Sequence, residues 1–230
     1  VAMIRWRLIS CLTAIAVQTI LAIPHVGASD IDQLSAFIEH GMELWHVPGM
    51  SVAVVSQDEV LYQEGFGYTA IDDGRPVDAH TLFAIASTTK AMVTAGLLML
   101  VDEEKFSLDD PIIKYVPELH FSEPSLTPQL TVRDLLAHRT GLPSTDLFYL
   151  QQMPLDQQLT RLRTVPAEAG VRTRLIYQNT MFEIAGLLIE RLTDLRWHQF
   201  LTDRLWHPIG MLETYGNRGE IRADQSFVKP

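Results

Sequence analysis

The sequence predicts an α+β fold whose strands lie near the start of the chain. Two β-rich runs, residues 50–56 and 60–66, are separated by three polar residues, which is the pattern of a hairpin. A long apolar run at 87–101 and an amphipathic run at 180–192 predict helices further along. Few strand patterns follow residue 85. Strands gathered in one part of a chain and helices in another are typical of α+β proteins.

Composition and charge narrow the classes of partner and site. The chain has 230 residues, 47% of them hydrophobic and 20% charged, which is enough apolar side chain for one substantial core. The net charge is −10 and the basic residues are scattered, so we expect no nucleic-acid partner. Cys11 is the single cysteine, which excludes an intramolecular disulfide. The eight histidines show no paired metal-binding spacing, so we expect no metal and no cofactor.

Residues 1–28 have the layout of a secretory signal peptide. They combine a start with two arginines, an uncharged apolar run over 8–23, and small residues at 26–28. An uncleaved membrane anchor is the alternative, because the run is only slightly shorter than a spanning helix. In either case we expect the domain at 29–230 to be secreted or periplasmic, with the membrane contacted only through an uncleaved leader.

The first element after the leader is an amphipathic helix over residues 30–46. Asp30 is a suitable N-cap, and Pro48 with Gly49 ends the helix. Apolar residues recur at helical spacing, which predicts one buried face. The predicted inward residues are Ile31, Leu34, Ile38, Met42 and Trp45.

Further helices are predicted in the second half of the chain. The run at 87–101 is apolar on nearly every side, so we expect a buried helix that begins at Ser87. Thr131 and Asp134 have the spacing of a capping box before a short helix that extends through Ala137 and stops at Gly141. The remaining predicted helices cover residues 155–162, 180–192 and 197–205, the second with Phe182, Ala185, Leu188, Ile189 and Leu192 inward.

Ser87 and Lys90 are the first candidates for chemistry. Three positions apart on a helix, they lie on the same face. The free N–H groups and positive end of a helix favour developing negative charge at Ser87. An ammonium there stabilises an alkoxide, and a neutral amine accepts the hydroxyl proton. The same spacing recurs by chance at Ser226 and Lys229, but only Ser87 leads into a long apolar helix.

Tyr177 and Asn179 are the second pair of candidates, directly before the amphipathic helix. A phenol near an ammonium ionises more easily and can move protons between a nucleophile and a leaving group. Asn179 can offer both a donor and an acceptor to an amide-bearing substrate. The residues alone leave a structural alternative open, with Tyr177 as a core tyrosine and Asn179 as a helix N-cap.

His138 suggests a Ser-His-Asp arrangement at first sight. The Gly-x-Ser-x-Gly turn of α/β-hydrolases is absent from this sequence, however, and its nearest approach at 49–53 begins a predicted strand. We therefore interpret His138 as a helix-end residue whose donor or cationic side chain suits the last carbonyl groups.

Taken in order, several segments resemble the serine β-lactamase and penicillin-binding-protein superfamily, and within it the class C-like branch. The resemblance runs through most of residues 30–215. Its segments are Val47-Pro48-Gly49-Met50-Ser51-Val52-Ala53-Val54-Val55, Gly65-Phe66-Gly67-Tyr68, Thr81 to Lys90, Leu135 to Pro143, Tyr177-Gln178-Asn179 and His207-Pro208-Ile209-Gly210-Met211.

This resemblance implies a mixed, mainly antiparallel sheet flanked by helices, with a helical subdomain, and an acyl-enzyme mechanism. In that mechanism Ser87 attacks a carbonyl group, Lys90 and Tyr177 transfer its proton, and Asn179 orients the substrate. The Ser87 N–H forms half of an oxyanion hole. The implied substrates are β-lactams, D-amino-acid peptides or esters, as small molecules or as peptidoglycan-like polymers.

One departure from the family concerns its third motif, Lys-x-Gly or His-x-Gly on a later strand. No such motif follows Asn179 in this sequence. We therefore expect residues 29–230 to be the N-terminal portion of the hydrolase domain, without its C-terminal strands. We also expect impaired activity, since loss of one oxyanion donor typically costs about a hundred- to a thousandfold in rate. The alternative is a non-catalytic cell-envelope binding protein that retains the fold.

Overall fold

The computed structural model describes residues 28–57, 59–72 and 74–228. They form two compact units, one up to Thr81 and the other from Leu82 to Phe227, each with its own hydrophobic core. The predicted signal peptide lies almost entirely outside the described residues. Within the described part of the chain, no helix has both the length and the apolar character needed to cross a membrane.

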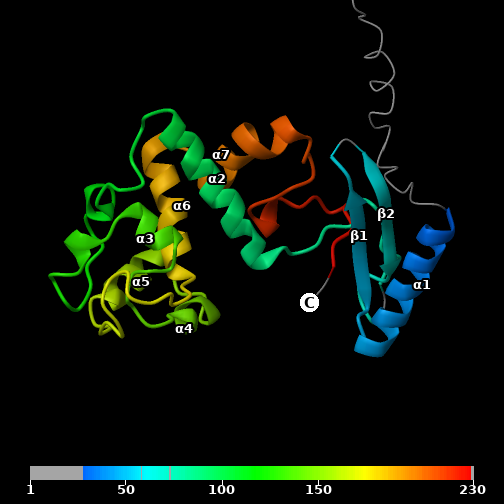
Figure 1. The fold of residues 1–230 in the computed structure, drawn as a ribbon, viewed down its shortest axis with the longest axis horizontal. Coiled ribbons are helices and arrows are strands. Elements are labelled where there is room, and N and C mark those ends of the chain that lie inside the picture. Colours follow the sequence, from blue (N-terminus) through cyan, green and yellow to red (C-terminus); the bar gives the residue numbers. More distant parts are fainter. Residues whose placement is uncertain (1–27, 58, 73, 229–230) are drawn as a thin grey trace, which may run out of the picture. The chain divides into compact units, whose positions relative to one another are not determined.

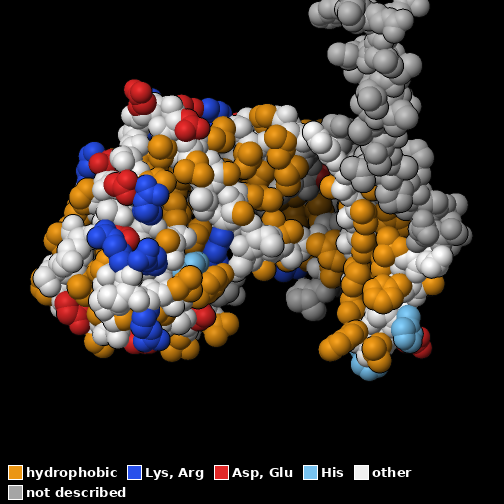
Figure 2. All heavy atoms as spheres, in the orientation of Figure 1, with side chains coloured by type: hydrophobic (Ala, Val, Ile, Leu, Met, Phe, Trp, Pro, Cys, Tyr) orange, Lys and Arg blue, Asp and Glu red, His pale blue; other side chains and the backbone are white. Residues whose placement is uncertain are grey.

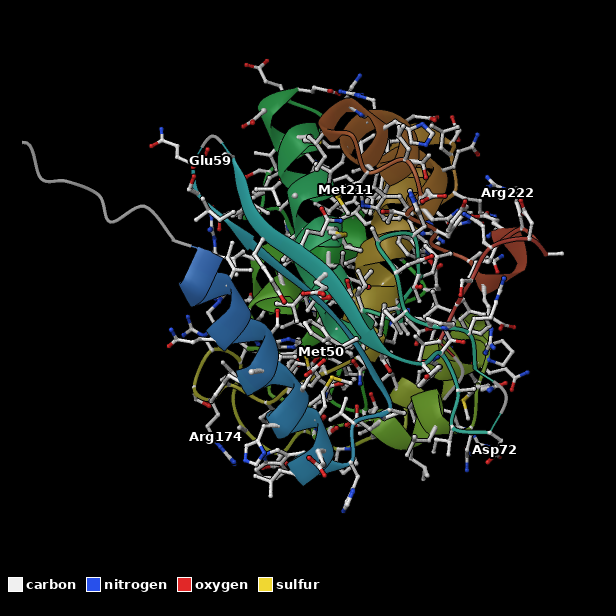
Figure 3. All side chains as sticks on the ribbon, turned by 90° about the vertical axis from the view of Figure 1, so that its right-hand side faces the viewer. Met50, Glu59, Asp72, Arg174, Met211 and Arg222 are labelled. Atoms are coloured by element: carbon white, nitrogen blue, oxygen red, sulfur yellow. The ribbon has the colours of Figure 1, made fainter. Side chains whose placement is uncertain are left out.

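The first unit is a helix packed along a hairpin (Figure 1). Helix α1 (Ala28–Trp45) precedes the antiparallel strands β1 (Gly49–Val55) and β2 (Val60–Gly67). The predicted hairpin is confirmed, with Met50 opposite Phe66. Figure 3 labels Glu59 in the turn between the strands.

The core of this first unit lies between α1 and one face of the hairpin. Met42, Tyr62 and Phe66 are buried there, and the Ser35 hydroxyl lies 2.8 Å from the Tyr62 hydroxyl. Two expectations for α1 are wrong. Asp30 lies inside the first turn and is not the N-cap, because the helix begins two residues earlier, at Ala28. Trp45, the last residue of the helix, is 78% exposed and does not belong to the buried face.

Not all of the hairpin is covered. Val54, Val55 and Val60, which flank the turn, are exposed. Figure 2 shows hydrophobic side chains along this hairpin, whereas acidic and basic side chains are interspersed over the helical second unit.

The second unit is helical and is built around one long helix. Helix α6 (Thr180–Thr193) is packed against α2, α3, α5 and α7 (Figure 1). The other helices of this unit are α2 (Thr89–Asp102), α3 (Val132–Leu136), α4 (Asp146–Leu150), α5 (Leu155–Leu162) and α7 (Trp197–Leu201), with a π-helical turn at Thr202–Trp206 and 3-10 turns at Ala86–Thr88, Ile112–Lys114, Thr127–Gln129, His207–Ile209 and Arg218–Glu220. Its core includes Leu97, Leu100, Met181, Ile184, Phe200 and Trp206.

Most predicted helices of this unit are confirmed, with local corrections. The Thr131–Asp134 capping box is present at the start of α3, and α5 has the predicted bounds. Ser87 does not begin α2: it lies in a 3-10 turn, and the α-helix starts at Thr89. Helix α2 is not buried on all sides either, since Leu98 is 41% exposed. Along α6 the buried face is formed by Met181, Ile184, Ala185, Leu188 and Ile189, while Phe182 and Leu192 are only partly buried.

Candidate active site

Ser87 lies in a tight turn whose backbone is unusual. The residue before it, Ala86, has a φ of +43°, a region that residues with a Cβ rarely adopt. Thr88 stabilises the turn because its backbone N–H and its hydroxyl both donate to the Ile85 carbonyl. Strained residues of this kind cluster at functional sites. This turn places Ser87 three residues before Lys90, which lies in the first turn of α2.

The Ser87 hydroxyl receives two hydrogen bonds from candidate catalytic groups. The Tyr177 hydroxyl donates to Ser87 Oγ at 2.7 Å, and Lys90 Nζ donates to the same atom at 3.0 Å. Ser87 is exposed, and Tyr177 is 42% exposed, so solvent reaches this group. The structure therefore brings together the three side chains that the sequence predicted, and it rejects the alternative of Tyr177 as a core residue.

Asn179 joins the same cluster. Its Oδ1 accepts from Lys90 Nζ at 2.7 Å, and its Nδ2 donates to Asp146 Oδ1 at 2.8 Å. Asn179 occupies the N-cap position of α6, but its side chain makes no capping bond there. The carboxylate of Asp146 can only accept, so this contact fixes which end of the Asn179 amide faces Lys90. Sequence reasoning missed Asp146, which begins the unpredicted helix α4.

Gln178, between the two candidate residues, is anchored in the core. It is fully buried, and its Nε2 donates to the carbonyl oxygens of Leu142, at 3.0 Å, and of Pro143. Its Oε1 accepts from the Thr145 hydroxyl at 3.0 Å. A buried polar network with its partners satisfied is rigid. The Gln178 side chain therefore fixes the short segment from which Tyr177 and Asn179 project.

His138 lies directly beside this segment. Its ring centroid is 4.5 Å from that of Tyr177 and 5.2 Å from that of Phe182. Its Nδ1 accepts the backbone N–H of Gln178 at 3.1 Å. The interpretation of His138 as a donor or cation for helix-end carbonyls is therefore wrong, because the ring nitrogen facing the chain is an acceptor. Burial, and then the positive charge of Lys90, lower the pKa of His138.

The electrostatics of the cluster favour ionisation of Tyr177. The adjacent Lys90 side chain and then the hydrogen bond with Ser87 lower the pKa of the Tyr177 phenol below its usual value. Lys90 Nζ lies 4.9 Å from the centroid of the Tyr177 ring and 5.4 Å from that of Phe182. The cation thus stabilises the phenolate and also contacts the faces of two aromatic rings.

The segment that leads to Tyr177 is held by a buried carboxylate. Arg172 donates to both oxygens of Asp134, at 2.8 and 2.7 Å, and the same carboxylate accepts from Thr131 in the capping box. Burial acts to raise the pKa of Asp134, but the hydrogen bonds from Arg172 and Thr131 outweigh it and lower the pKa. This pair connects the start of α3 to residue 172, five positions before Tyr177.

Gly141 allows a close approach of two loops near this segment. It has a φ of +83°, and a Cβ built on it would lie 2.2 Å from the Ala169 carbonyl oxygen. The N–H groups of Glu168 and Ala169 both donate to the Gly141 carbonyl. The predicted stop after α3 thus also aligns the loop before Tyr177.

The described residues contain no cluster of side chains that could bind a metal ion. Across residues 28–57, 59–72 and 74–228, no three histidine, cysteine or acidic side chains lie together as they would around a metal ion. The expectation of a site without metal or cofactor stays a prediction.

Comparison with known proteins identifies the family of this chain. The Beta-lactamase family model matches residues 34–226. The chain belongs to the β-lactamase family. Unguisins hydrolase ungD of Aspergillus violaceofuscus is 33% identical over 189 residues, which cover 77% of this chain and 33% of that protein.

Solved structures of this family share the fold. The octameric penicillin-binding protein homologue from Pyrococcus abyssi superposes with a TM-score of 0.76 and 26% identity, over 86% of this chain and 47% of that one. A class C β-lactamase in complex with cefoxitin gives a TM-score of 0.73 and 25% identity, over 87% of this chain and 55% of that one. The resemblance to the serine β-lactamase and penicillin-binding-protein superfamily is confirmed, as is the α+β, β-lactamase/transpeptidase-like fold.

These matches cover only part of the length of each related protein. The chain spans about a third of the length of the curated relative and about half of each solved chain. The family to which the chain belongs, and the solved structures similar to it, include serine hydrolases.

Proposed function

We propose that this chain carries the nucleophile and the proton-transfer groups of a serine acyl-transfer hydrolase. One observation carries the proposal: Ser87 Oγ accepts hydrogen bonds from both the Tyr177 hydroxyl, at 2.7 Å, and Lys90 Nζ, at 3.0 Å. A nucleophilic serine needs a base within this range, and a second polar group to orient that base. Lys90 is that second group beside Tyr177, and Lys90 is itself held by Asn179, which also bonds to Asp146.

The reaction begins with attack of Ser87 Oγ on a substrate carbonyl carbon. The Tyr177 phenolate, favoured by its lowered pKa, takes the hydroxyl proton as the new C–O bond forms. The bond from the carbonyl carbon to the amine or alcohol of the substrate then breaks, and the leaving group receives the proton from Tyr177. Attack by water on the acyl-serine ester releases a carboxylic acid and restores Ser87. Throughout, Lys90 stabilises the anionic partner.

For the substrate we propose a β-lactam, a D-amino-acid peptide or an ester, either as a small molecule or within a peptidoglycan-like polymer. Each has a carbonyl group open to attack by serine. One relative is named an unguisins hydrolase, and one solved neighbour is a class C β-lactamase in complex with cefoxitin. A secreted or periplasmic location suits such substrates. Because relatives extend well beyond the matched region, the turnover of the 230 residues alone is proposed to be impaired.

Covalent labelling tests this proposal. The protein is incubated with a fluorophosphonate probe and, separately, with a penicillin, and the adduct is located by peptide mass spectrometry. We expect one adduct, on Ser87, which Ser87→Ala abolishes. The matched control is Ser226→Ala, which removes the other serine that precedes a lysine by three positions. The buried hydroxyl of Ser226 has no hydrogen-bond partner among the described residues, so this control should fold and label normally.

Two outcomes would contradict the proposal. Folded protein that forms no adduct with either reagent would favour a binding protein that retains the fold without turnover. An adduct that persists in the Ser87→Ala variant would place the nucleophile elsewhere.

A further inference from the structure

His138 contacts the chain on both sides of Tyr177. Its carbonyl oxygen accepts the N–H of Ile176 at 2.9 Å, and its Nδ1 accepts the N–H of Gln178 at 3.1 Å. Tyr177 is thus the residue between two backbone donors that bind the same histidine. Neither contact involves the reacting atoms, and the proposed reaction gives His138 no proton to transfer.

The histidine ring also supports the phenol itself. Tyr177 is 42% exposed, so burial alone leaves its ring able to rotate away from Ser87. The His138 ring, at a centroid distance of 4.5 Å and an interplanar angle of 34°, covers one part of it. Phe182 contacts the same imidazole at 5.2 Å and so limits its movement. Contacts between rings at such centroid distances add to the packing of both side chains.

We propose that His138 is the positioning residue that holds the Tyr177 phenol against Ser87, an inference that rests on the proposed acyl-transfer function. The backbone bonds fix residues 176 and 178, and the ring contact fixes the direction of the side chain between them. An unprotonated Nδ1 is required for the bond to Gln178, because a protonated nitrogen has no lone pair to accept. Burial and the charge of Lys90, which lower the pKa of His138, favour this unprotonated state.

The backbone at His138 explains how one residue makes all these contacts. Its φ of +55° is left-handed, and its own N–H donates to the Leu135 carbonyl at the end of α3. This turn directs both the carbonyl oxygen and the side chain of His138 toward the segment at 176–178. Among residues with a side-chain acceptor, asparagine best tolerates such a φ, so His138→Asn preserves this backbone turn.

Two substitutions separate these contacts. His138→Asn keeps a side-chain acceptor and tolerates the backbone angle, but it lacks the ring. His138→Gly removes both the acceptor and the ring without straining the backbone. The matched control is Gln152→Gly, a change at another left-handed residue, which is exposed and lies in the turn after α4. Far-ultraviolet circular dichroism and a thermal melt establish that each variant is folded.

Two readouts are measured for each protein. The first is the pKa of Tyr177, from the pH dependence of its ring signal in protein labelled with ¹³C-tyrosine and assigned with Tyr177→Phe. The second is the rate at which a fluorophosphonate labels Ser87. In His138→Gly we expect the pKa of Tyr177 to rise toward that of free tyrosine, and labelling to slow about tenfold to a hundredfold. His138→Asn should lie between this variant and the wild type, and Gln152→Gly should match the wild type.

The outcomes distinguish this inference from the function on which it rests. A folded His138→Gly protein with the wild-type Tyr177 pKa and the wild-type labelling rate would overturn the positioning role. If the glycine variant does not fold, a folded His138→Asn protein with the wild-type Tyr177 pKa and labelling rate would overturn the positioning role instead. If the pKa of Tyr177 rises in the variants but not even the wild type is labelled, the positioning role stands and the acyl-transfer function fails.

Discussion

The side-chain oxygen of Asn179 lies 2.7 Å from Nζ of Lys90, and this contact joins two motifs that are 89 residues apart. It completes a chain of hydrogen bonds that starts at Asp146 and passes through Asn179 and Lys90 to Ser87 and Tyr177. Lys90 lies in α2 and Asn179 directly precedes α6, and these two helices pack against each other within the helical unit (Figure 1). Each side chain in this series of hydrogen bonds restricts the position of the next side chain.

The contact between Asp146 and Asn179 leads to a first prediction. Asp146→Ala removes the acceptor for Asn179 Nδ2, so the amide is free to turn its nitrogen toward Lys90. We expect covalent labelling of Ser87 to slow about tenfold, the equivalent of about 1.4 kcal/mol. Asp146→Asn is the control, because its amide oxygen can still accept and most of the rate should remain. Equal rates in the wild type and the alanine variant would show that Asp146 has no role in orienting Asn179.

The candidate site was predictable where it depends on short spacing. Ser87 and Lys90 are three residues apart, so their proximity follows from helical geometry, even though the serine lies in a 3-10 turn. The joining of Tyr177 to this pair, across 90 residues, could be expected only from the resemblance to a family. Asp146 and His138 were missed as site residues because their contacts are 33 and 40 residues apart in sequence.

The fold shows the same division between local and long-range information. The hairpin, α5 and α6 follow from periodicity and turn residues, and the structure contains them close to the predicted bounds. The exposure of Trp45 and Leu98 depends on what neighbours each helix, which apolar content alone does not specify. The one available signal for His138 was its place in the segment 135–143, which carried the family resemblance.

The buried amide of Gln178 leads to a second prediction. Gln178→Ala leaves the Thr145 hydroxyl with one partner fewer and removes the donor to the Leu142 and Pro143 carbonyls. We expect the free energy of unfolding, measured by urea denaturation, to fall by about 2 kcal/mol or more. The exposed Gln151→Ala is the control, and its effect should stay within about 0.5 kcal/mol. A similar small effect at Gln178 would mean that this network does not hold the segment.

The buried carboxylate of Asp134 leads to a third prediction. Asp134→Ala removes the capping box of α3 and the two hydrogen bonds from Arg172, which is itself about half exposed. We expect a loss of about 2 kcal/mol in the free energy of unfolding at neutral pH. Asp109→Ala is the matched control, because its ion pair with Arg133 is exposed on both sides and should contribute less than about 1 kcal/mol.

The effect of Asp134 should also depend on pH, with a defined sign. Its pKa is lowered in the folded protein, so its contribution is complete above the ordinary carboxyl pKa of about 3.9 and is lost as the pH falls through the lower folded-state value. The difference in unfolding free energy between the wild type and Asp134→Ala should therefore shrink in acid. A difference that stays constant from neutral pH to pH 2 would contradict the assignment of an ionised Asp134.

The pKa of Tyr177 gives the most direct test of the cluster, because it reports the position of Lys90 without requiring turnover. Lys90 is the main cause of the lowered pKa and the hydrogen bond with Ser87 is the second. In Lys90→Met the phenol should therefore titrate at a higher pH than in the wild type, and Ser87→Ala should shift it in the same direction but less. Tyr115 serves as an internal control, since burial and then its hydrogen bond to Asp110 raise its pKa and neither substitution touches those groups. If Tyr177 titrates identically in all three proteins while Tyr115 remains unchanged, then the lysine does not stabilise the phenolate, and the base in the proposed reaction has to be assigned to another group.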